Sequence, residues 1–184
     1  MQPIYAAELL INKITKDYKD DIAVVVIMGS TLYGDTHSRS DLDLFFVPKT
    51  ERGNNLGFTF ILDSIGYDFW SISWDRLERI ANHDERITSI ITEGKMIYCA
   101  SDADETHYNE IKKKALDTSV RRRFLAKASV KLDEVYKSLY HLQKSESLSD
   151  IRMAAIGMVY SISDVLVLLN RIPVKRGRGK LKSE

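Results

Sequence analysis

The chain has 184 residues, of which 44% are hydrophobic and 29% are charged, a composition typical of a globular protein with room for one sizeable domain or two small ones. Its 27 basic and 26 acidic residues leave a formal net charge of +1, which argues against a nucleic-acid partner because such proteins usually carry a basic excess. The single cysteine, Cys99, excludes an intramolecular disulfide and a cysteine-based zinc site.

The N-terminus and the apolar segments indicate where the protein resides. Residues 1–5 lack the basic-then-apolar pattern of a signal peptide. The longest apolar stretch, residues 156–169, is interrupted by Ser161, Ser163 and Asp164, so we expect no membrane span and no membrane partner. These observations predict a cytoplasmic protein.

The first part of the chain alternates between helical and extended patterns. Apolar side chains recur at helical spacing over residues 4–18, and the Val-rich segment 22–28 predicts a buried strand. A second strand is expected over 41–47, because Pro48 cannot continue it. Residues 51–57 are polar and predict a loop.

Further strand and helix patterns complete this part. Residues 66–73 alternate and are rich in aromatic side chains, which is typical of a strand. Ser73 is a good N-cap for a helix over 75–80. A short helix near 86–92 and a small strand at 95–99 follow.

The pattern becomes helical throughout near residue 102. Three helices are expected, over 103–116, 119–144 and 149–171. The sequence therefore predicts an α+β fold, with one domain at 1–101 built around a small sheet and a helical domain at 102–184.

Residues 29–44 carry the most informative pattern in the chain. Gly29 and Ser30 end the first apolar strand, where a glycine allows close approach to a phosphate and a serine hydroxyl can donate to it. Asp41 and Asp43 are two residues apart, so both carboxylates project from one face of a strand. Mg²⁺ commonly binds through one or two carboxylates together with substrate phosphates. The pattern predicts a site that holds Mg²⁺ against a nucleoside triphosphate, with two ions as the expected number.

Asp68 is the candidate for a third carboxylate, on a neighbouring strand. Tyr67 and Phe69 belong to the opposite face, so Asp68 can point toward the aspartate pair. There it could also accept the proton of an attacking hydroxyl. A solvent-facing aspartate without function is the alternative interpretation of this residue.

The segments Gly29-Ser30 and Ser40-Asp41-Leu42-Asp43-Leu44, together with Gly34, resemble the signature of the polymerase-β-like nucleotidyltransferase superfamily. The resemblance implies a small mixed sheet with helices on one side, Mg²⁺ at the aspartates and transfer of a nucleoside monophosphate from a nucleoside triphosphate. Arg39 and Ser40 would then contact the nucleotide beside Gly29 and Ser30, although a surface role for Arg39 is an equal alternative.

The layout, an α/β part followed by a C-terminal helical bundle, is similar to that of the aminoglycoside (kanamycin-type) nucleotidyltransferases. This similarity implies ATP as the donor, a hydroxyl of a small molecule as the acceptor and pyrophosphate as the leaving group. It also implies an acceptor-side base from the helical part, for which Asp133 and Glu134 are the candidates. A solvated helix face, with Lys131 and Lys137 as ionic partners, explains both acids equally well.

Two other functions stay open at this stage. The acceptor could be a protein, as in toxin–antitoxin nucleotidyltransferases, or the chain could be a nucleotide-binding module without catalysis. Asp164, which interrupts an apolar helix, is a further candidate acid, and its alternative is a polar position at a helix–helix contact. A homodimer that completes the acceptor site is also consistent with the small helical part.

Overall fold

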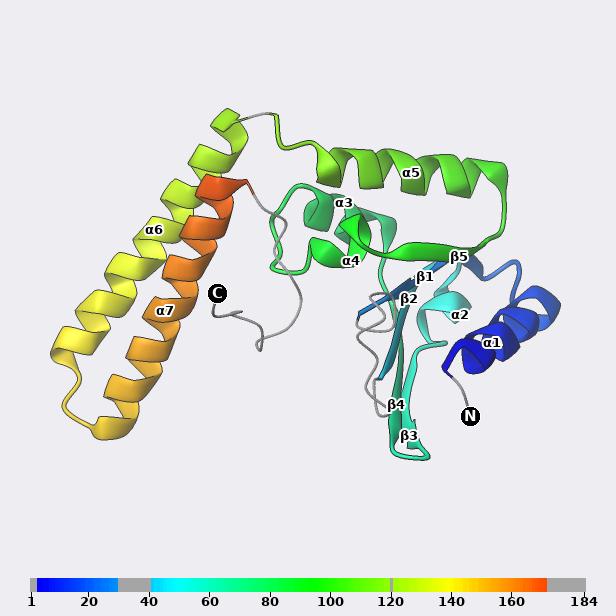
Figure 1. Cartoon of the computed structure of the whole chain (residues 1–184), viewed down its shortest axis with the longest axis horizontal. Helices are drawn as coiled ribbons and strands as arrows, with labels where there is room; N and C mark the ends of the chain where they lie inside the picture. The colour runs from blue at the N-terminus through cyan, green and yellow to red at the C-terminus, as the bar shows by residue number, and fades with distance from the viewer. Residues whose placement is uncertain (1–2, 30–40, 120, 172–184) are drawn as a thin grey trace. The chain divides into compact units, whose positions relative to one another are not determined.

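The computed structural model describes residues 3–29, 41–119 and 121–171. The described residues through Leu116 form one compact unit, which contains the sheet, and residues 117–171 form a second, helical unit. The boundary predicted from the sequence lies earlier, before residue 102. Figure 1 labels the elements of both units.

The sheet of the first unit has five strands, in the order β3-β4-β2-β1-β5. Strand β1 pairs antiparallel with β2 and β5, β3 pairs antiparallel with β4, and β2 pairs parallel with β4. The strands have the following bounds: β1 (Ile22–Met28), β2 (Leu42–Pro48), β3 (Phe58–Leu62), β4 (Ile65–Ser71) and β5 (Lys95–Cys99). The sheet is therefore mixed, as the resemblance implied.

Helices cover both faces of this sheet. Helix α1 (Pro3–Asp17) packs on one face, where Ile14 joins a buried cluster with Val25 and Phe46. Helices α3 (Trp74–Ala81), α4 (Ser89–Thr92) and α5 (Asp102–Leu116) supply the buried cluster on the other face. The resemblance implied helices on one side only. The two-sided cover explains why every residue of β1 is buried, since both of its faces meet apolar side chains.

Local capping fixes the start of two helices in this unit. The Ser73 hydroxyl accepts a hydrogen bond from the backbone N–H of Arg76 at 3.2 Å, so the predicted N-cap of α3 is confirmed. Residues 51–57, which the sequence predicted as a loop, contain the one-turn helix α2 (Glu51–Asn54). The cause is Thr50, whose hydroxyl accepts from the N–H of Gly53 at 3.0 Å.

The structure contains a strand that the sequence analysis did not identify. Strand β3 joins β4 through Asp63 and Ser64, whose φ angles of 53° and 63° are those of a tight hairpin turn. Non-glycine residues adopt this left-handed region less readily than glycine does. Because the turn residues are Asp63 and Ser64, the usual Asn-Gly or Asp-Gly signal of such a turn is absent at this position.

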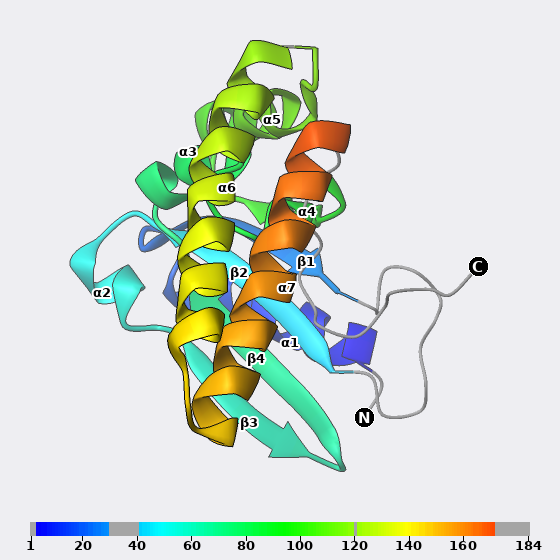
Figure 2. The same ribbon diagram turned by 90° about the vertical axis from the view of Figure 1, so that its left-hand side faces the viewer.

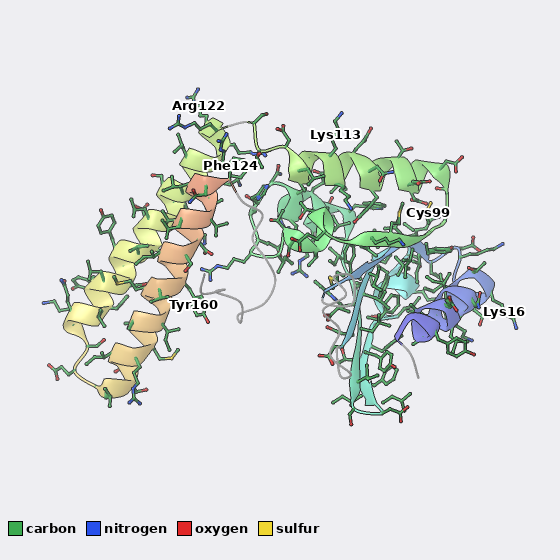
Figure 3. The ribbon with its side chains drawn as sticks, viewed as in Figure 1. Lys16, Cys99, Lys113, Arg122, Phe124 and Tyr160 are labelled. Carbon is green, nitrogen blue, oxygen red and sulfur yellow. The ribbon has the colours of Figure 1, made fainter. Side chains whose placement is uncertain are left out.

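The second unit is a pair of antiparallel helices, α6 (Arg121–Lys144) and α7 (Leu148–Asn170), which run side by side (Figure 2). Ser147 caps α7 by accepting from the N–H of Asp150 at 3.1 Å. Phe124, labelled in Figure 3, is buried in a cluster with Ala128 and Leu168. The helices predicted at 119–144 and 149–171 are confirmed.

Helix α7 is apolar on its exposed side as well as on its packed side. Met153, Ile156 and Val159 are between 50% and 67% exposed. Within the described chain, the segment Leu148–Leu169 has the length and composition of a membrane-spanning helix, a test that core helices of soluble proteins also pass. Ser161 and Asp164, which the sequence argument took as interruptions of the apolar stretch, are buried and so do not break its outer surface.

Candidate active site

Two carboxylates lie opposite each other on neighbouring parallel strands of the sheet. Asp43 of β2 is the register partner of Asp68 of β4. The residues that flank Asp68, Tyr67 and Phe69, are buried in the cluster beneath α1, as is Leu44 next to Asp43. Because side chains alternate along a strand, both carboxylates project from the other face.

The apolar core of that other face ends where the acids begin. Phe45 follows Asp43 by two residues, and Trp70 follows Asp68 by two; their rings meet edge to face with centroids 6.4 Å apart. Phe45 belongs to the cluster formed with α3, α4 and α5, and the partly buried Trp70 packs against it. Met28, the register partner of Asp43, is buried in the same cluster. The carboxylates are half-buried at the margin of this core.

Gly29 ends β1 directly beside Asp43. Its φ is +84°, in the left-handed region that glycine adopts without a Cβ penalty. A Cβ at this position would lie 2.8 Å from Oδ2 of Asp43. Glycine is therefore needed here for two reasons, the backbone turn and the space that the Asp43 carboxylate occupies.

Asp41 is held by the backbone of β4. Its Oδ1 accepts a hydrogen bond from the N–H of Gly66 at 2.9 Å, across 25 residues of sequence. A Cβ at Gly66 would lie 2.6 Å from that oxygen, so a larger residue there would displace the Asp41 carboxylate. Asp41 lies just before β2, two residues from Asp43, and that the two acids share one face of the strand stays a prediction.

Asp68 has a neighbour that the sequence analysis missed. The Thr59 hydroxyl donates to Oδ1 of Asp68 at 2.7 Å, and the two residues are register partners in the β3–β4 pair. The pattern Phe58-Thr59-Phe60, with a polar residue between two aromatic ones, was the available signal. This pattern could not point to Asp68, because the segment had not been predicted to be a strand.

The donor set of this site consists of carboxylate oxygens, the ligand type that Mg²⁺ prefers. Asp43 and Asp68 are the facing pair, and Asp41, just before β2, accepts a hydrogen bond from the N–H of Gly66. Within the part of the chain that the structure describes, no three acidic, histidine or cysteine side chains are gathered closely enough to form a ready-made metal site. An in-register pair of carboxylates fits an ion whose other ligands are substrate phosphates and water.

The remaining predicted site residues fall elsewhere. Ser30, Arg39 and Ser40 lie outside the described residues. Asp133 and Glu134 lie on α6 in the second unit, where the Lys131 ammonium donates to Oε1 of Glu134 in an ion pair at 2.8 Å. This is the contact expected for a solvated helix face, and the role of these two acids as an acceptor-side base stays a prediction. Asp164 is buried on α7.

The fold of the chain can be compared with solved structures. The chain is similar to the crystal structure of a nucleotidyltransferase-like protein from Exiguobacterium sibiricum, with a TM-score of 0.50 and 10% sequence identity. The match covers 96% of this chain and 60% of that chain, so this chain spans less than two thirds of the length of its neighbour. At this identity the likeness concerns the fold. No family model and no curated protein matches the sequence.

Proposed function

We propose that the protein is a Mg²⁺-dependent nucleotidyltransferase. It would move a nucleoside monophosphate, AMP from ATP, to a hydroxyl of a small polar molecule such as an aminoglycoside. The observation that carries this proposal is the in-register pair Asp43 and Asp68 beside the left-handed turn at Gly29. The nucleotidyltransferase-like fold of the neighbour agrees with it.

In the proposed reaction the acceptor oxygen attacks the α-phosphorus of ATP. A new oxygen–phosphorus bond forms, the bond from the α-phosphorus to the bridging oxygen of the β-phosphate breaks, and pyrophosphate leaves. Mg²⁺, when bound, supplies charge neutralisation on the phosphates. Asp41, Asp43 and Asp68 would hold it, and Asp68 would also accept the proton of the attacking hydroxyl.

The residues of the proposed site would position the metal and the substrates and would form no covalent bond with them. The missing side chain at Gly29 leaves room for the Asp43 carboxylate beside the turn that follows β1. The apolar core formed by Phe45 and Trp70 supports the strands that carry the acids. A rigid sheet of this kind keeps the carboxylates in place, which is what transfer reactions of phosphorus mainly require.

The experiment that tests the proposal compares two labels on ATP. The protein is incubated with Mg²⁺, a panel of aminoglycosides and ATP labelled at either the α- or the γ-phosphate. We expect the acceptor to gain the α-label only, and the transfer to stop with EDTA and in Asp43→Asn. Transfer of the γ-label alone would identify a phosphotransferase and overturn the proposal, as would absence of Mg²⁺-dependent nucleotide binding.

The same assay separates the alternatives. Label that enters a protein band in a cell lysate, and no small molecule, would assign the acceptor to the protein class. Mg²⁺-dependent ATP binding without transfer to any acceptor would favour the module without catalysis.

A further inference from the structure

The side chain of Thr59 is joined to the proposed site by a cross-strand hydrogen bond. Its hydroxyl donates to Oδ1 of Asp68 at 2.7 Å, within the distance range of a strong O–H···O bond to a carboxylate. Thr59 and Asp68 are directly opposite each other in the antiparallel β3–β4 pair. The contact therefore comes from the register of the sheet.

Aromatic packing on the opposite face fixes this register. Phe58 contacts Phe69 with ring centroids 5.2 Å apart, and Phe60 stacks on Tyr67 at 4.9 Å with an interplanar angle of 10°. A slip by one residue would turn these rings to the face of the acids and carry the Thr59 hydroxyl away from it. The hairpin thus holds one hydroxyl in front of one carboxylate.

The choice of threonine adds stiffness to this arrangement. A β-branched side chain in a strand has restricted χ1, so the hydroxyl does not sample many directions. The bond to Oδ1 restrains rotation of the Asp68 carboxylate group, and with it the direction of Oδ2. A carboxylate that must meet a metal ion or a proton loses efficiency when its orientation varies.

We propose that Thr59 is a positioning residue, which orients Asp68 for its role in nucleotidyl transfer. This inference rests on the proposed function and adds to it a residue on β3, outside the aspartate signature. Thr59 does not itself touch the reacting atoms. It acts through Asp68.

The test uses two substitutions at the same position. Thr59→Val keeps the β-branched shape and removes the donor, whereas Thr59→Ser keeps the donor. We expect Thr59→Val to lower kcat by about 10- to 100-fold, with the KM for ATP changed less than about threefold. Thr59→Ser should recover most of the lost rate. Thr15→Val, on an exposed position of α1 whose hydroxyl donates to the carbonyl of Ile11, is the matched control and should leave kcat unchanged.

A double-mutant cycle with Asp68→Asn assigns the effect to the carboxylate. If Thr59 acts through Asp68, Thr59→Val should cost little further activity in the Asp68→Asn background. Equal losses in both backgrounds, a wild-type kcat in Thr59→Val, or failure of Thr59→Ser to recover would each overturn the inference.

Mg²⁺-dependent binding of a non-hydrolysable ATP analogue, measured by calorimetry, gives a readout that does not need turnover. If the wild-type protein transfers nucleotide and Thr59→Val behaves identically, only the role of Thr59 is refuted. Wild type that neither transfers nor binds the analogue would refute the proposed function and this role together.

Discussion

Replacing Gly29 by alanine tests how the turn after β1 serves the site. The φ of +84° places the new Cβ in the left-handed region, which costs about 1–2 kcal/mol for an L-residue. The same Cβ would lie 2.8 Å from Oδ2 of Asp43. Because the crowded atom is the end of a side chain, the carboxylate can turn away, and the contact adds little to the stability cost.

The two consequences of Gly29→Ala therefore differ in size. We expect the free energy of unfolding to fall by about 1–2 kcal/mol from the backbone strain. Displacement of the Asp43 carboxylate should lower the rate of nucleotidyl transfer by about 100-fold. Expressed as a free energy, this loss of activity is larger than the expected loss of stability. Gly29→Asn should separate the loss of stability from the loss of activity. Asparagine tolerates the left-handed region better than alanine does, so stability should fall less, whereas its side chain still crowds Asp43.

The positions of the tryptophans make the stability measurement specific. Both tryptophans of the chain, Trp70 and Trp74, lie in the sheet unit, so urea unfolding followed by tryptophan fluorescence reports on that unit. Gly157→Ala on α7 is the matched control, because among the described residues a Cβ there meets only Ser138 Oγ at 3.7 Å. In a helix interior this change should stabilise by about 0.5–1 kcal/mol, seen by far-UV circular dichroism. Wild-type stability and activity in Gly29→Ala would refute the reasoning.

Three further predictions concern the acids, a buried hydroxyl and a cap. The double change Asp41→Asn and Asp43→Asn should lower transfer by orders of magnitude in the labelled-ATP assay. The melting temperature without metal should stay equal or rise, because the two like charges no longer repel each other. A large loss of folding would instead mean that the pair is structural. Within the described chain the buried Tyr108 hydroxyl has no hydrogen-bond partner, so Tyr108→Phe should leave the free energy of unfolding unchanged or raise it by up to about 1 kcal/mol in urea, and a clear loss would reveal a partner. Burial also raises the pKa of Tyr108 above 10.0, so the free energy of unfolding should fall as pH rises past 10, because the unfolded chain releases this proton more readily than the folded one. Tyr108→Phe should reduce that decline in pH-dependent unfolding. Ser73→Ala should lower the stability of the sheet unit by about 1 kcal/mol by tryptophan fluorescence, and an unchanged midpoint would mean that the cap of α3 is dispensable.

The sequence predicted the elements whose patterns are local. The seven-residue apolar run of β1 indicates a buried strand, and the alternation around Asp68 indicates both a strand and its buried face. The facing of Asp43 and Asp68 is different, because it depends on parallel pairing between β2 and β4, which no local pattern specifies. The acids could be named from the sequence, and their register could not.

The hairpin that carries Thr59 shows where sequence patterns were insufficient. The turn at Asp63 and Ser64 uses positive φ without glycine, so β3 lacked the usual signal at its end. At its start, the polar residues after Thr50 predicted a loop, although the Thr50 hydroxyl caps a short helix there. Without β3, the partner of Asp68 could not be identified.

Strand β3 lies at the edge of the sheet and is hydrogen-bonded to β4 alone among the described strands. Edge elements open at a lower free energy than central ones, so the hydroxyl that orients Asp68 belongs to one of the least protected segments of the sheet. By linkage, a ligand that binds better when Asp68 is oriented must also disfavour opening of β3. Amide hydrogen exchange over Phe58–Leu62 should therefore slow when the site is occupied, which makes the backbone of this strand a reporter of binding at the acids.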